Sequence, residues 1–220
     1  MRAFFFICLA TFAAIVLSGQ KPARAEPARP LPAWEEALAK QGALKPAANF
    51  SGIGDRNARS LALYAEATKV ITHPRCMNCH PVDNIPRQGA AMKVHSPPMT
   101  GALDGHGPAG QRCSTCHGVK NFEQTGGDNI QSIPGNPKWA LAPASMAWQG
   151  KTPGEICRQI KDTSRNGGKD LEALYHHMAE DELVGWGWNP GKGRAPAPGD
   201  QKQFGELIRA WIDTGAACPA

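Results

Sequence analysis

Two five-residue segments of the chain, residues 76–80 and residues 113–117, have the order Cys-x-x-Cys-His. In this pattern the two thiols form thioether bonds to a haem, and the adjacent imidazole binds its iron. The four thiols are Cys76, Cys79, Cys113 and Cys116. The two proximal imidazoles are those of His80 and His117. The sequence therefore predicts two covalently bound haem c groups, each with an iron atom.

Paired cysteines also occur in zinc ribbons and in redox-active dithiols. A zinc ribbon separates its two pairs by roughly 15 to 20 residues and needs no histidine after each pair. Here 33 residues lie between Cys79 and Cys113. A thioredoxin-type dithiol belongs to a βαβ pattern, and the sequence does not have one. The two motifs therefore favour haem.

The second face of each iron needs a ligand from elsewhere in the chain. His95 lies between the two motifs, on a segment that must run close to both haems, and it is our candidate for one iron. His177 lies on a predicted helix and can face the interior while His176 faces away, so it is our candidate for the other. The reserve candidates are His73, Met146 and Met178. Two imidazoles on each iron would give lower potentials than a His-Met pair.

The first residues of the chain have the order of a secretory signal peptide. Arg2 precedes an apolar run over residues 3–17, and Ala23-Arg24-Ala25 forms an A-x-A cleavage site. The apolar run is shorter than the roughly 20 residues that cross a bilayer. We therefore expect cleavage after residue 25, a periplasmic protein, and no integral membrane segment in the mature chain.

The cysteines outside the motifs agree with export. Of the seven cysteines, four belong to the motifs and Cys8 leaves with the signal peptide, so Cys157 and Cys218 remain. In an oxidising compartment such a pair is expected to form a structural disulfide. Two unpaired thiols are the alternative, because a sequence does not show the distance between them.

Charge and composition limit the fold and the partners. Removing residues 1–25 lowers the count of Lys and Arg from 24 to 21, against 19 acidic residues, so no basic surface for nucleic acid is expected. The chain has 24 glycines and 19 prolines, which indicates many loops. We expect a mainly α fold in which short helices and long Gly/Pro-rich loops wrap around two haems. We expect a flexible lead with a short helix over 26–56 and a compact dihaem domain over 57–220.

Several elements can be placed from apolar spacing and capping residues. A helix over 57–72 should deliver the chain to the first motif, and residues 81–111 should be extended or turning. A capping box at Thr152 and Glu155 predicts the start of the helix over 153–160. The expected helices are 34–41, 57–72, 153–160, 171–182 and 201–214. The tryptophans are expected to be ordinary core residues, although packing on the haems is an alternative.

The chain also resembles a known family. Residues 73–81 (HPRCMNCHP), 112–117 (RCSTCH), 143–146 (PASM), 165–168 (RNGG) and 185–188 (GWGW) are similar to bacterial exported dihaem cytochromes c. These belong to the group of isoquinoline 1-oxidoreductase-like subunits. The resemblance implies an electron carrier with redox-protein partners, taking electrons from a periplasmic molybdenum hydroxylase and passing them to a respiratory chain. It does not imply hydroxylase activity, because the chain lacks the iron-sulfur and molybdopterin machinery.

Two functions follow from these expectations. The first is a periplasmic dihaem electron carrier with no substrate of its own. The alternative is a dihaem peroxidase-like enzyme, in which one iron keeps an open or displaceable position for peroxide. Proteins of that class are typically larger and divided into two clear haem domains. The ligand on the second face of each iron distinguishes the two functions.

Overall fold

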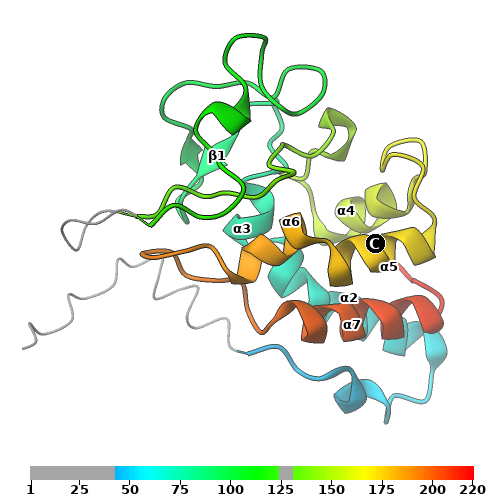
Figure 1. Ribbon diagram of the computed structural model, residues 1–220. Coiled ribbons are helices and arrows are strands. Elements are labelled where there is room, and N and C mark those ends of the chain that lie inside the picture. Colours follow the sequence, from blue (N-terminus) through cyan, green and yellow to red (C-terminus); the bar gives the residue numbers. More distant parts are fainter. Residues whose placement is uncertain (1–42, 124–130) are drawn as a thin grey trace, which may run out of the picture. The chain divides into compact units, whose positions relative to one another are not determined.

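The computed structural model describes residues 43–123 and 131–220, and all of them belong to one compact unit, Leu31–Ala220 (Figure 1). The expected signal peptide, the expected helix over 34–41 and most of the expected lead lie outside the described residues. In chain order, the elements are η1 (Ala47–Phe50), α2 (Arg56–Ile71), α3 (Pro74–Met77), β1 (Arg87–Gln88), β2 (Lys93–Val94), η2 (Cys113–Thr115), η3 (Ala144–Met146), α4 (Pro153–Lys161), α5 (Leu171–Glu180), α6 (Glu182–Gly185), η4 (Trp186–Trp188) and α7 (Gln201–Asp213). The described part is therefore mainly α, with short helices and a two-stranded antiparallel sheet.

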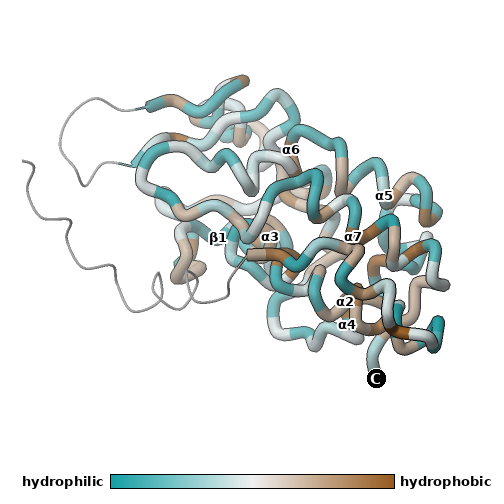
Figure 2. The backbone as a smooth tube through the Cα atoms, turned by 90° about the horizontal axis from the view of Figure 1, so that it is seen from below, coloured by the Kyte–Doolittle hydropathy of each residue, from teal (hydrophilic) through white to brown (hydrophobic). Residues whose placement is uncertain are grey.

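Four helices build the hydrophobic core. Helix α7 packs against both α2 and α5, and α4 adds the side chains of Ile156 and Ile160. The rings of Tyr64 on α2 and Trp211 on α7 are 5.3 Å apart at the centre of this packing. Apolar residues recur along α2 and α7 in Figure 2. These helices form the base from which the loop-rich segment projects.

The helix ends follow local capping chemistry. The Thr152 side chain accepts a hydrogen bond from the Glu155 amide, and the Glu155 carboxylate accepts one from the Thr152 amide, so the predicted capping box is confirmed. The Asp170 side chain accepts a hydrogen bond from the Ala173 amide and caps α5. The Asp200 side chain accepts one from the Gln203 amide and caps α7. Helix α5 ends earlier than predicted because Asp181 accepts a hydrogen bond from the Leu183 amide and begins α6.

A long segment with little regular structure lies between α3 and α4. As predicted, residues 81–111 are extended or turning, with only β1 and β2 paired. The first motif begins on α3 and the second on η2, each a single short turn. Both motifs therefore begin on short turns that are followed by irregular backbone.

The predicted disulfide is present. The Sγ atoms of Cys157 and Cys218 are 2.00 Å apart, which joins α4 to the end of the chain. In the part of the chain that the structure describes, no helix has both the length and the apolar character needed to cross a membrane.

Candidate functional site

The two motifs open onto two neighbouring cavities. A cavity of about 280 Å³ contains Cys76, Cys79 and His80 of the first motif. A second cavity of about 260 Å³ contains the thiols and imidazole of the second motif, Cys113, Cys116 and His117. Apolar and aromatic side chains make up most of both walls. Each motif therefore has its own hydrophobic space, which suits a large apolar macrocycle.

Both motif imidazoles are held in the same way. His80 makes a hydrogen bond of 2.7 Å through Nδ1 to the carbonyl of Met146, and His117 makes one of 2.8 Å through Nδ1 to the carbonyl of Pro134. A carbonyl only accepts, so Nδ1 carries the proton and Nε2 keeps its lone pair. This is the arrangement in which protein imidazoles bind metals.

One segment supplies both of these carbonyls. Residues 131–148 run from Pro134, beside the second motif, to Met146, beside the first. Along the way the amides of Ala142 and Trp148 donate to the carbonyls of Cys79 and His80, respectively. We call residues 131–148 the clamp segment, because it fixes both imidazoles.

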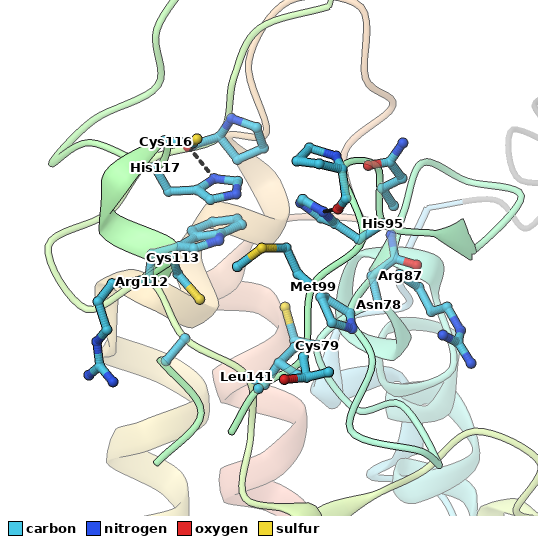
Figure 3. A pocket seen from close by; sticks show the side chains of 18 of the residues that line it. Asn78, Cys79, Arg87, His95, Met99, Arg112, Cys113, Cys116, His117 and Leu141 are labelled. Carbon is cyan, nitrogen blue, oxygen red and sulfur yellow. Dashed lines mark hydrogen bonds between the residues drawn. The ribbon is translucent and has the colours of Figure 1, made fainter. Parts of the chain in front are cut away.

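The second cavity brings a second imidazole opposite the first. His95 lies across the cavity from His117, with the side chain of Met99 between them in this view (Figure 3), and the two ring centroids are 5.9 Å apart. Two imidazoles on opposite faces of one metal would have centroids about 6 Å apart, with metal-nitrogen bonds of about 2 Å and about 1 Å from each nitrogen to its centroid. His95 also bonds the Pro97 carbonyl through Nδ1 at 2.8 Å, which leaves its Nε2 as an acceptor. The centroid distance of the pair therefore matches that of two imidazoles that share one metal.

The first cavity offers several second ligands. His177, Met146 and Met178 all line it together with His80. His177 is half-buried, and its Nδ1 lies 3.4 Å from a carboxylate oxygen of Asp181. His176, by contrast, is exposed and lies between two glutamates, so the predicted orientation of the two neighbouring histidines is confirmed.

His73, a reserve candidate, has a different place. It is only 1% exposed, and its Nδ1 accepts a hydrogen bond of 3.2 Å from the Arg75 amide at the start of α3. It lines neither cavity. His73 therefore caps a helix, and we do not carry it forward as a ligand.

Burial sets the protonation of the motif side chains. Burial lowers the pKa of His80 to about 4, although the hydrogen bond to the Met146 carbonyl opposes this, and burial also lowers the pKa of His117. Both rings are thus neutral near pH 7, as metal binding requires. Burial raises the pKa of Cys76 to about 12 and that of Cys79 to about 11. Redox-active dithiols instead have a cysteine of lowered pKa.

Two cavity-lining residues have a buried polar atom without a hydrogen-bond partner among the described residues, which a polar group on a bound molecule could supply. Trp148 is 6% exposed, its ring stacks on His80 with centroids 3.5 Å apart, and its Nε1 has no hydrogen-bond partner among the described residues. Asn78, 7% exposed, lines the second cavity and has an unpartnered Oδ1. A buried donor without an acceptor costs about 1 to 3 kcal/mol, and a carboxylate of a haem would relieve that cost at Trp148.

The charged side chains among the described residues of the two cavity walls are all basic, which suits a bound group that carries carboxylates. No Asp or Glu occurs among the described residues that line either cavity. The basic residues that line them are Arg75, Arg87, Arg112, Lys169 and Arg194. A haem brings two carboxylates, so a positive lining without acids fits it. Within residues 43–123 and 131–220, no group of three or more His, Cys, Asp and Glu is arranged to hold a metal ion by itself.

Sequence reasoning missed several lining residues. Trp139 and Trp186 line both cavities, with ring centroids 4.9 Å apart, so the expectation of ordinary core positions is wrong for these two. It holds for Trp211, which is buried in the helical core. Met99 also lines the second cavity. A positional signal existed for Arg75 and Arg112, each of which directly precedes the first cysteine of a motif.

Comparisons of the chain with family models, with curated proteins and with solved structures find no match.

Proposed function

We propose that this chain is an exported dihaem c-type cytochrome that carries electrons. Each Cys-x-x-Cys-His segment would attach one haem inside its own cavity. The observation that carries the proposal is the opposed pair His117 and His95, with centroids 5.9 Å apart and both Nδ1 atoms used on backbone carbonyls. Such a pair leaves an Nε2 lone pair on each of two imidazoles that line the same cavity.

The residues would divide the work as follows. The thiols Cys76, Cys79, Cys113 and Cys116 would form the thioether links. His80 and His117 would be the proximal ligands, with His95 opposite His117. His177 would be the second ligand in the first cavity, with Met178 and Met146 as alternatives there. When bound, haem supplies one-electron exchange at iron. The chain's own role is to orient the imidazoles, keep them neutral and limit water.

One observation favours a second candidate function. His95 is held by a backbone carbonyl, whereas His177 is half-exposed and its Nδ1 lies 3.4 Å from the Asp181 carboxylate. A less firmly held ligand can be displaced, which is what a peroxidase-like enzyme needs at one iron. This candidate predicts a high-spin fraction and a fast reaction with peroxide, whereas the carrier predicts neither.

Compartment and partners follow from the sequence and from the resemblance. The A-x-A site at residues 23–25 and the Cys157–Cys218 disulfide support a periplasmic location. The family resemblance proposes a molybdenum hydroxylase as donor and the respiratory chain as acceptor. These partners are redox proteins, and we propose no nucleic-acid partner.

Haem stoichiometry tests the proposal directly. The full chain would be exported in a host that attaches haem c, and pyridine haemochrome spectra should give two haems per chain. The double variants Cys76→Ser/Cys79→Ser and Cys113→Ser/Cys116→Ser should each retain one haem. The matched control Cys157→Ser/Cys218→Ser, which removes the same number of thiols outside the motifs, should retain two. A wild-type chain that attaches no haem would overturn the proposal.

Spectra of the ferric protein then identify the ligands. Two bis-imidazole irons should give low-spin EPR signals without the near-infrared band of methionine ligation. Such a band from one of the two haems would assign Met178 or Met146 to the first cavity or Met99 to the second. A band from both would overturn the His95 and His177 assignments.

A further inference from the structure

The two cavities share part of their walls. The residues that line both are Arg75, Cys79, Trp139, Ala140, Leu141 and Trp186. Of these, only Arg75 carries a charge near pH 7. Every other basic residue in the walls belongs to one cavity alone, Lys169 to the first and Arg194, Arg87 and Arg112 to the second.

Arg75 is held firmly in this shared position. The residue is 5% exposed, and its Nε donates a hydrogen bond of 2.7 Å to the carbonyl of Ala195. It belongs to α3 and directly precedes Cys76, so the backbone that carries a motif thiol also carries the guanidinium. A buried, bonded side chain of this kind keeps its charge at a fixed place rather than moving into solvent.

The positive charge of Arg75 acts on the thiols of the first motif, one of which lies in the shared wall. The positive charge of Arg75 works against burial at Cys76 and Cys79, where it lowers the pKa of both thiols. It also lowers the pKa of His73. Cys79 lines both cavities, so the same charge is effective at a residue common to the two.

We propose that Arg75 is a positioning residue shared by both haem sites and that it sets the two reduction potentials together. The inference rests on the proposed function. Reduction adds one electron to an iron centre, and a fixed cation in a poorly screened interior stabilises the more negative state. A guanidinium also pairs with carboxylates such as those of haem. One charge at the shared wall therefore raises both potentials.

The test is a redox titration of the holoprotein and of Arg75→Gln, which keeps a hydrogen-bond donor for Ala195 but loses the charge. We expect both steps of the titration to move to lower potential. The expected loss in each reduction equilibrium constant is on the order of tenfold, which corresponds to about 59 mV for a one-electron couple. Arg194→Gln is the matched control. Arg194 donates to Ser132 much as Arg75 donates to Ala195, but it lines only the second cavity, so one step alone should move.

Several outcomes would overturn the inference. Unchanged potentials in Arg75→Gln, or a change in one step only, would show that the residue does not act on both sites. If the glutamine variant loses a haem, Arg75→Lys decides instead. Its ammonium lacks the guanidinium fork, so both potentials should fall in parallel by a smaller factor, and a single shift or none would count against a shared role. A wild-type protein without two haems would overturn the proposed function as well, which separates the two failures.

Discussion

The buried histidine at the start of α3 makes a quantitative prediction about acid stability. His73 caps the helix that carries Cys76, and its Nδ1 accepts from the Arg75 amide. Replacement by asparagine keeps a side-chain acceptor of the kind that helix N-caps favour, and it removes the titrating ring. His73→Asn should therefore leave the fold intact near pH 7 and change how stability depends on pH.

The magnitude follows from the pKa. Burial, with a smaller contribution from the Arg75 charge, lowers the pKa of His73 from 6.5 to about 4 in the folded chain. Because the folded pKa is the lower one, the unfolded chain binds the proton more readily. Stability is then fully present above pH 6.5 and is lost as pH falls from 6.5 to 4. A pKa difference of about 2.5 corresponds to about 3 kcal/mol, of which about 2 kcal/mol is lost between pH 7 and pH 4.5.

The assay is urea unfolding of the holoprotein at pH 7 and at pH 4.5, followed by far-ultraviolet circular dichroism. The wild type should lose about 2 kcal/mol more than His73→Asn over this interval. His106→Asn, at an exposed loop position, serves as the control and should follow the wild type. Equal losses in the wild type and His73→Asn would refute the reasoning. A change in the spin state of either haem in His73→Asn would refute the placement of His73 outside both cavities.

Three further predictions concern other parts of the molecule. Cys157→Ala/Cys218→Ala opens a link across 61 residues and should lower the free energy of unfolding by about 4 kcal/mol in urea, without changing the haem count; a loss below about 1 kcal/mol would contradict it. Thr152→Ala breaks the capping box of α4 and should cost about 1 kcal/mol in the same assay, with an unchanged midpoint as the contrary result. His95→Ala should convert half of the ferric iron from low spin to high spin by EPR, and a spectrum like the wild type would assign the second ligand elsewhere.

The sequence predicted the parts of the fold that depend on local signals. The apolar spacing of residues 57–72, the capping box at Thr152 and the caps at Asp170 and Asp200 all act within one or two turns, and all four helices are present. The end of α5 was missed because Asp181 serves as the cap of the next helix, and a capping aspartate within an apolar pattern resembles an ordinary surface residue. Element type was therefore easier to predict than element length.

In the candidate site, too, the residues with a local sequence signal were predicted and those placed by tertiary contacts were not. The cysteines and histidines of the motifs are recognisable because their spacing is specific. The carbonyls that fix the imidazoles are not, because every residue has a carbonyl and only the tertiary fold selects those of Met146 and Pro134. The wall positions of Trp139 and Trp186 likewise depend on contacts between distant segments, since tryptophans in a core and beside a cofactor look alike in sequence.

The clamp segment also affects the order in which the two motif imidazoles are fixed during folding. His117 bonds to the Pro134 carbonyl, 17 residues further along the chain, whereas His80 bonds to the Met146 carbonyl, 66 residues further along. Closing the longer loop costs about 1 kcal/mol more in chain entropy, and nearer contacts generally form sooner. In a chain made from its N-terminus, the contact of His117 with Pro134 can therefore form within a short stretch, whereas the contact of His80 with Met146 forms later. The motif imidazole that comes first in the chain is therefore the one that is fixed last.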